Sequence, residues 1–317
     1  MHNRVLLSAL IAGAMLLPGQ AHSQPATPIG AMGVSVSDLG NPYFVAAARG
    51  AERRARTLDP EVRVEVLSSA YDLDRQIAQI DHFIASGMRL ILISAADPEA
   101  IGPAVQRARD AGIRVIAIDV EATGADATIT TDNRQAGIEA CRYLAERIDR
   151  KGNVVIINGP PVSSITERVS GCHDALDHYP DIELLSDSEN GAGAREGGME
   201  KMTALMTAYP DIQGVFAIND PSALGAEQAA RQAGRDSFVI VSVDGSPAAV
   251  ERLQQPDSRL QATAAQFPRR IAEQAVDVGV RLLQGETVEP RRILIEPKLI
   301  TRENLDEIGD AWDIRSP

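Results

Sequence analysis

The stretch RLILISAADPEAIGPAVQRARDAGIRVIAID, residues 89–119, decides the fold. Its two ends, 89–94 and 113–119, are short continuous apolar runs, which are typical of strands buried on both faces of a parallel sheet. Between them, residues 97–112 carry helix-forming residues and end at Gly112. The order strand, helix, strand predicts a parallel β-α-β unit.

The same alternation continues in both directions from this unit. Apolar runs predict strands at 29–36, 62–68, 153–159, 182–187, 212–220 and 238–245. Amphipathic segments predict helices at 42–57, 72–86, 133–148, 164–179, 197–210, 221–234 and 269–285. Two series of about four or five strands each predict an α/β fold of two doubly wound parallel-sheet lobes.

The first 23 residues have the pattern of a signal peptide. Arg4 precedes an apolar run of about fourteen residues, shorter than the roughly twenty that a membrane span needs. Small residues follow, and cleavage fits after Ala21 or Ser23. Because no cysteine lies at this cleavage zone, lipid anchoring is not expected. We expect an exported, periplasmic chain from which residues 1–23 are removed.

Composition and motifs exclude several functions. The formal net charge of −13 argues against a nucleic-acid partner, since phosphate binding needs a basic face. The sequence has no phosphate-binding loop, no glycine fingerprint after a strand, no nucleophile elbow and no metal-ligand spacing, so we expect no cofactor, no metal and no enzyme. For Cys141 and Cys172, export permits a disulfide, and two buried thiols fit the sequence equally well.

Polar residues follow several predicted strands: Ser37, Asp38, Asp97, Asp119, Asn219, Asp220 and Asp244. Taken singly, each fits the N-cap of the next helix. In open α/β sheets, however, ligands bind outside the carboxyl ends of the strands. The recurrence of polar ends across both lobes therefore favours a shared cleft.

Seven segments carry a resemblance to a known family: NPYFVAAARGAE (41–52), GMRLILISAADPEAI (87–101), AGIRVIAIDVE (111–121), TTDNRQAG (130–137), YPDIQGVFAINDPSALGA (209–226), VSVDGSP (241–247) and LQATAAQFP (260–268). In this order and spacing, the chain resembles the periplasmic sugar-binding proteins of ABC importers, of ribose-binding type. The resemblance implies lobes of residues 24–131 plus 267–295 and 132–266 plus 296–317, joined by a three-segment hinge that closes on a ligand. It places the crossings near Thr131, Gln266 and Ile295.

The resemblance also implies the ligand-binding residues. Carried over position by position, they are Asn41, Tyr43, Phe44, Asp119, Asn219, Asp244 and Gln266, with Thr166 at an eighth binding position. At least one of the two rings, Tyr43 or Phe44, is expected to face the ligand.

Three positions depart from the ribose-binding pattern. Val120 and Thr166 stand where ribose binders carry arginine, and Gly193 aligns with an aromatic residue. The loss of two guanidinium groups removes donors to the ligand and leaves Asp119 and Asp244 without an evident cationic neighbour. Arg134 and Arg168 are candidates for a partial substitute, but the sequence does not place either in the cleft. These departures argue against ribose. They favour a ligand that brings its own donors, such as a polyol or cyclitol, or a positive charge, as an amino-substituted sugar does.

The expected function is therefore capture of a small polyhydroxylated ligand by a monomeric solute-binding protein and its delivery to the membrane permease of an ABC importer. One alternative is a receptor that presents its ligand to a chemoreceptor or sensor kinase. A DNA-binding regulator that shares this core would need an N-terminal helix-turn-helix, where this chain has a leader. An exported enzyme would need a nucleophile, base or metal set that the sequence lacks.

Overall fold

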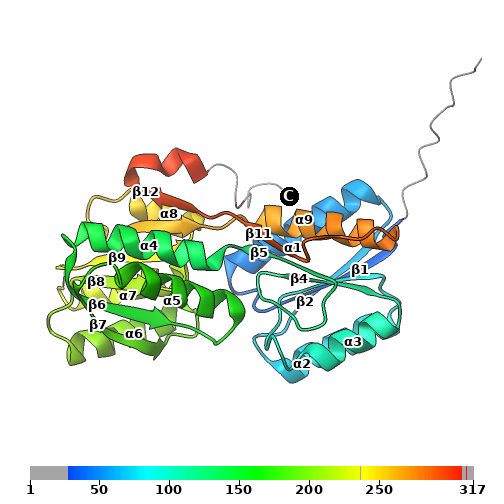
Figure 1. The fold of residues 1–317 in the computed structure, drawn as a ribbon, viewed down its shortest axis with the longest axis horizontal. Helices are drawn as coiled ribbons and strands as arrows, with labels where there is room; N and C mark the ends of the chain where they lie inside the picture. Colours follow the sequence, from blue (N-terminus) through cyan, green and yellow to red (C-terminus); the bar gives the residue numbers. More distant parts are fainter. Residues whose placement is uncertain (1–27, 236, 309–311, 313–317) are drawn as a thin grey trace, which may run out of the picture.

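The computed structural model describes residues 28–235, 237–308 and 312 of the 317-residue chain, so the expected signal peptide at 1–23 lies outside the described residues. Two α/β lobes lie side by side, each built on one sheet (Figure 1). Each sheet has six strands, more than the four or five expected, because the sequence patterns did not reveal the strands at 127–131, 260–265, 292–295 and 298–301. The predicted two-lobed α/β class is confirmed.

The first sheet is parallel throughout, with the strand order β11-β5-β4-β3-β1-β2. Its strands are β1 (Ala31–Val36), β2 (Arg63–Ser68), β3 (Leu90–Ile93), β4 (Arg114–Ile118), β5 (Ala127–Thr131) and β11 (Arg292–Ile295). The helices that cover it are α1 (Pro42–Leu58), α2 (Leu73–Ala85), α3 (Gly102–Asp110) and α9 (Pro268–Leu283).

Strand β3 shows why this sheet is sandwiched between helices. Leu90 and Leu92 pack with residues of α1 and α9, whereas Ile91 and Ile93 pack with residues of α2 and α3. All four side chains are fully buried. Since successive side chains of a strand point to opposite faces, a continuous apolar run needs cover on both.

The second sheet has the order β12-β10-β9-β8-β6-β7 and is parallel except that β12 runs antiparallel to β10 at one edge. Its strands are β6 (Lys151–Asn158), β7 (Asp181–Asn190), β8 (Gly214–Ala217), β9 (Val239–Asp244), β10 (Leu260–Ala265) and β12 (Lys298–Thr301). The helices of this lobe are α4 (Asn133–Arg147), α5 (Ser163–Leu176), α6 (Arg195–Ala208), α7 (Asp220–Gln232) and α8 (Pro247–Leu253), followed by a 3₁₀ helix (Arg302–Ile308).

Element boundaries differ most from expectation at α3, which begins at Gly102 rather than at residue 97. The carboxylate of Asp97 accepts hydrogen bonds from the backbone N–H groups of Glu99 and Ala100, at 3.0 and 2.9 Å. These bonds form a turn before the helix starts. Asp is common in such turns because its side chain accepts hydrogen bonds from the backbone just after it.

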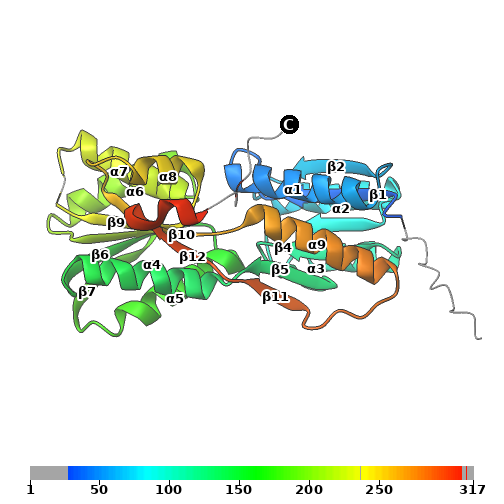
Figure 2. The same ribbon diagram turned by 90° about the horizontal axis from the view of Figure 1, so that it is seen from above.

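Three chain crossings join the lobes and lie beside one another (Figure 2). The Thr131 hydroxyl donates to Oε1 of Gln266 at 2.7 Å, which ties the first crossing to the second. The backbone N–H of Asp132 donates to the carbonyl of Ile295 at 2.9 Å, which ties the first to the third. The exact lobe boundaries given above stay a prediction.

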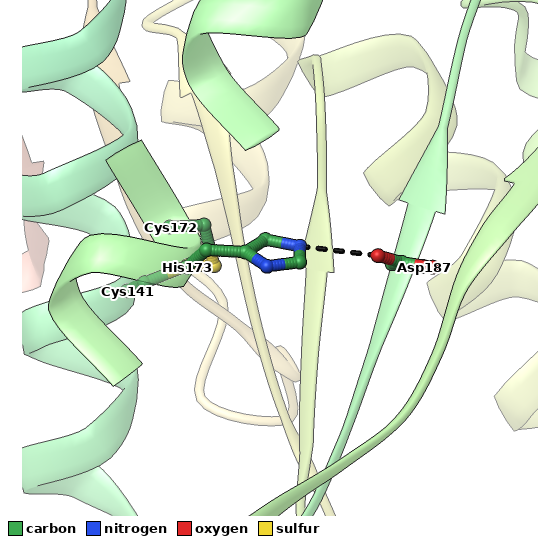
Figure 3. Close-up of a disulfide and its surroundings, with 4 residues drawn as sticks. All are labelled: Cys141, Cys172, His173 and Asp187. Carbon is green, nitrogen blue, oxygen red and sulfur yellow. Dashed lines mark ion pairs between the residues drawn. A yellow bond between two sulfur atoms is a disulfide. The ribbon is translucent and has the colours of Figure 1, made fainter. Parts of the chain in front are cut away.

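Helices α4 and α5 pack unusually closely and are cross-linked. A Cβ atom on Gly137 would lie 2.0 Å from the carbonyl oxygen of Arg168, and one on Gly171 would lie 2.0 Å from that of Arg134, so both glycines are needed for this approach. Next to this crossing, Cys141 and Cys172 form a disulfide with their Cα atoms 5.1 Å apart (Figure 3). Of the two alternatives that the sequence left open, the structure has the disulfide.

Candidate ligand-binding site

A cavity of about 550 Å³ lies between the lobes, a volume suited to a small molecule. The first lobe contributes Asp38, Gly40, Asn41, Pro42 and Tyr71 to its lining. The second lobe and the segment after it contribute Ala192, Gly193, Ala194, Arg195, Glu196, Pro221, Leu224, Asp244, Ser246, Pro247, Ala248 and Trp312. The lining therefore combines a mostly apolar surface with a few polar groups, as is typical of small-molecule sites.

Asp244, at the carboxyl end of β9, connects the cavity wall to the protein interior. Its Oδ1 accepts a hydrogen bond from Nε2 of Gln266 at 2.7 Å, and its Oδ2 accepts one from the backbone N–H of Asp220 at 3.3 Å. The guanidinium of Arg168 reaches Oδ1 with Nη1 at 3.7 Å, and both of these side chains are about 95% buried. The expectation that Asp244 lacks a cationic neighbour is therefore wrong.

Arg168 is held in place by two further hydrogen bonds. Its Nε donates to Oδ1 of Asn133 at 2.8 Å, and its Nη1 donates to the backbone carbonyl of Ile218 at 2.9 Å. Because α4 carries Asn133 and α5 carries Arg168, the close crossing of these helices sets the position of the guanidinium. A buried charge needs such partners.

The same polar chain continues into the first lobe. Nδ2 of Asn133 donates to the Thr130 hydroxyl at 3.2 Å, and that hydroxyl donates to the backbone carbonyl of Asp119 at 2.6 Å. On the other side of the hinge, the Thr131 hydroxyl meets Gln266, the partner of Asp244. We call Asp119, Thr130, Thr131, Asn133, Arg168, Asp244 and Gln266 the hinge network; it joins the strand ends of both lobes.

Burial favours the neutral form of both carboxyl groups in this network. It raises the pKa of Asp119 to about 6, although nearby Arg168 and the Tyr43 hydroxyl act in the opposite direction. Burial likewise raises the pKa of Asp244, and the neighbouring carboxyl of Asp220 raises it further. Carboxyl groups that are costly to ionise when no ligand is bound are ready to exchange hydrogen bonds with one.

The backbone is strained at the same two positions. Asp119 has φ of +62° and Asp244 has φ of +136°, a range that residues other than glycine seldom adopt. Such strain clusters at functional sites, where the surrounding structure over-determines the conformation.

The eight residues predicted from the sequence take different places. Asn41 and Asp244 line the cavity; Asn41 also caps α1 by accepting from the backbone N–H of Tyr43 at 3.0 Å. Asp119 and Gln266 belong to the hinge network behind it. Asn219 caps α7 and donates to the carbonyl of Gly193, a residue of the cavity wall, at 2.8 Å.

Tyr43 and Phe44 are both buried and meet edge to face, with ring centroids 5.2 Å apart. Neither is among the described residues that line the cavity in this arrangement of the lobes, and a ligand contact by one of the two rings stays a prediction. The Tyr43 hydroxyl points toward the carboxyl of Asp119, but no described group meets full hydrogen-bond geometry with it.

Thr166 lies elsewhere. Its side chain is exposed, its hydroxyl donates to the carbonyl of Ser163, and it lines a separate hollow with Glu121. Of the other two departures from the ribose-binding pattern, Val120 is buried among apolar side chains and Gly193 is on the cavity wall with φ of +66°.

Several residues of the site were not predicted from the sequence. Arg168 was, with Arg134, a candidate for replacing the missing arginines, but no sequence pattern places it beside Asp244, where the structure has it. Tyr71 lines the cavity from the turn after β2, and Trp312 lines it from beyond the last strand. For Tyr71 and Trp312 the only available signal was their rarity in a chain that is 3% aromatic.

Comparisons with known proteins agree with this architecture. The family model described as periplasmic binding protein domain matches residues 32–287. The ribose import binding protein of Salmonella typhimurium is 32% identical over 271 residues, which cover 84% of this chain and 89% of that protein. The xylitol-binding protein of Mycolicibacterium smegmatis is 29% identical over 283 residues, which cover 87% and 78%.

Among solved structures, a periplasmic solute-binding protein of an ABC transporter from Actinobacillus succinogenes, with bound D-allose, superposes with a TM-score of 0.80. It is 27% identical, and the match covers 87% of this chain and 99% of that one. By their names, these three proteins are binding proteins for ribose, xylitol and D-allose, and two of them serve transport systems. The chain belongs to the periplasmic binding protein family, as a type I sugar-binding protein.

Proposed function

We propose that this protein is exported to the periplasm, where it captures one small sugar, polyol or cyclitol between its lobes and delivers it to the permease of an ABC importer. In this proposal residues 1–23 are the cleaved signal peptide and the mature chain works as a monomer. The lobes, 24–131 plus 267–295 and 132–266 plus 296–317, close on the ligand by rotation about the three crossings. Within residues 28–235, 237–308 and 312, every helix is too short or too polar to cross a lipid bilayer.

The observation that carries the proposal is the hinge network next to an interlobe cavity. Asp244 belongs to both, and with Asn41 it lines a cavity whose surface is largely apolar. A polyhydroxylated ligand fits this pairing, because its hydroxyls exchange hydrogen bonds with the polar groups while its C–H faces contact the apolar wall. Thr131, Gln266 and Arg168 link the same carboxyl to the hinge, so a ligand bound there is coupled to the angle between the lobes.

A ligand other than ribose is part of the proposal. Val120 and Thr166 supply no cationic donor, and the structure places Thr166 outside the cavity. Arg168 provides one guanidinium, but it already contacts Asn133, the Ile218 carbonyl and Asp244 within the protein, which leaves few of its N–H groups for a ligand. The ligand must therefore supply much of the donor capacity itself, as a polyol does.

The acidic lining favours an amino-substituted sugar as the second candidate. Asp38, Glu196 and Asp244 face the cavity, against one lining cation, Arg195, among the described residues. An ammonium group placed beside the carboxylates of Asp38 and Glu196 would gain charge-assisted hydrogen bonds, and its positive charge would favour the ionised form of Asp244.

A thermal-shift screen tests the proposal. The panel contains D-ribose, D-allose, xylitol and other pentitols, inositols, amino sugars and, for comparison, unrelated nitrogenous compounds, each at millimolar concentration. A true ligand at about 100 times its Kd stabilises the folded state by about 2.7 kcal/mol, which raises Tm by about 5 °C. A panel in which only an unrelated nitrogenous compound raises Tm, or none does, contradicts the sugar-class proposal.

A further inference from the structure

The aromatic side chains near the interlobe cavity fall into two groups. Tyr43 and Phe44 are buried in the apolar core of the first lobe, each with 3% of its surface exposed. Tyr71 and Trp312 also pack with this apolar cluster, but they line the cavity as well. Trp312 is the single tryptophan of the chain and follows the last strand, β12, by more than ten residues.

Trp312 is attached to both lobes. Its ring meets the Tyr43 ring of the first lobe edge to face, with centroids 6.0 Å apart and an interplanar angle of 76°. Its Nε1 donates to the backbone carbonyl of Asp244 in the second lobe at 3.3 Å. Only 5% of Trp312 is exposed, so the indole is fixed in a defined place beside the candidate ligand carboxyl.

The second lobe's own contribution to the wall lacks a ring. Gly193 has no side chain, and the nearest atoms to a Cβ built there are Nδ2 of Asn219 at 3.3 Å and a carbon of Pro160 at 4.0 Å. The other apolar lining residues of this lobe are small or aliphatic: Ala192, Ala194, Pro221, Leu224, Pro247 and Ala248. Trp312 and Tyr71 are therefore the two aromatic rings among the described residues that line the cavity, and Trp312 is the larger side chain.

We propose that Trp312 is a ligand-contacting residue whose indole packs against the apolar C–H face of the bound sugar or polyol, while Asp244 and Asn41 take its hydroxyls. This inference rests on the proposed function and adds a specificity-determining residue from outside both sheets. An indole face paired with a carboxyl and an amide favours ligands with one apolar and one hydroxyl-rich face.

The fluorescence of the single tryptophan provides a direct test with the full mature chain. The panel compound that raises Tm most is titrated into wild-type protein while tryptophan emission is recorded. We expect a saturable change in emission with the same Kd as calorimetry gives, because the ligand changes the surroundings of Trp312 and the chain has no other tryptophan. Ligand binding with unchanged emission overturns the inference and leaves the proposed function standing.

Two variants extend the test. W312A should weaken binding of the same compound at least about tenfold, while W312F, which keeps an aromatic face, should stay within about threefold. The apo Tm of each variant checks folding, and the wild-type emission result stands even if W312A folds poorly. Unchanged or tighter binding by a folded W312A overturns the inference. If no panel compound raises the wild-type Tm, the proposed function fails and the inference fails with it.

Discussion

At the residue scale, the site depends on carboxyl groups that the fold keeps away from water. Asp119 is 6% exposed and Asp244 is 2% exposed. Each stands at the carboxyl end of a buried strand, and each has a positive φ. Neither position is favourable for the isolated, ligand-free chain, since burial penalises charge and left-handed backbone penalises most residues. This cost is consistent with positions kept for binding rather than for stability.

The first prediction concerns the ionisation of Asp119. Its pKa is about 6 when folded, against an ordinary value of 3.8, so between these values the folded state binds more protons than the unfolded state. Its contribution to stability is therefore largest at low pH and is lost as pH rises through about 6. From pH 4.5 to pH 7.5 the loss amounts to about 2 kcal/mol.

D119N removes this dependence while keeping the side chain's shape. The unfolding free energy of ligand-free D119N relative to wild type should rise by about 2 kcal/mol between pH 4.5 and pH 7.5. Urea denaturation of both proteins at the two pH values measures it. A difference between the proteins that is the same at both pH values would show that Asp119 ionises normally in the fold.

The sequence predicted part of the site, for reasons that can be given residue by residue. Asp119 and Asp244 stand at the carboxyl ends of apolar strands that the sequence predicts, and such ends converge in parallel sheets, so their approach was predictable. Gln266 was assigned from the family resemblance, because the strand before it was not predicted. The partner role of Arg168 was not, because it depends on how closely two helices cross. Thr166 was assigned from the family resemblance alone. It lies two residues before the buried Arg168 on α5, and this spacing places the two side chains on opposite sides of the helix.

At the element scale, the α4–α5 pair sets the geometry of the hinge network. Gly137 and Gly171 permit the close crossing, and the Cys141–Cys172 disulfide fixes it beside Arg168 (Figure 3). His173, next to Cys172, lies 3.2 Å from the carboxylate of Asp187 on β7, which links α5 to its sheet. The two helices were predictable from the spacing of their apolar residues. The short distance between them was not, because a glycine within a helix does not by itself indicate a close helix crossing.

The second prediction concerns this disulfide. The double variant C141A/C172A should lower the free energy of unfolding by about 3–4 kcal/mol, the value expected for a link across 31 residues. Urea denaturation measures the change, and a thiol titration of the unfolded wild type, expected to find no free thiol, is the control. Two free thiols in the wild type, or equal stabilities, would show that the link is not formed.

At the scale of the whole molecule, polar contacts join the lobes on the side of the second hollow. Arg292 on β11 pairs with Glu121 at 2.7 Å and with Glu167 on α5 at 2.5 Å. Beside them, the backbone N–H of Glu121 donates to the Ser163 hydroxyl at 2.9 Å. Because Glu167 and Ser163 belong to the second lobe, these contacts favour the arrangement of the lobes seen here.

The third prediction tests this interlobe pair. R292Q should shift the ligand-free protein toward more open arrangements, seen as a larger radius of gyration in small-angle X-ray scattering. The ratio of open to closed molecules should change by no more than about fivefold, since an exposed ion pair contributes at most about 1 kcal/mol to the closed arrangement. The matched control is R291Q, because Arg291 pairs only within its own loop with Glu289, 3.7 Å away, among the described contacts. Identical scattering from R292Q and wild type would contradict a role for this pair in lobe closure.

The central claim is that one small polyhydroxylated ligand binds between the lobes at Asp244. Calorimetric titration of the most stabilising panel compound into wild type, D244A and T166A tests it most directly. We predict one site per chain in the wild type and a loss of about 100-fold in affinity for D244A, since the buried carboxyl group proposed to meet the ligand's hydroxyls is removed. For T166A we predict a change of less than about twofold. Wild-type affinity in a folded D244A, or a comparable loss in T166A, would contradict the account.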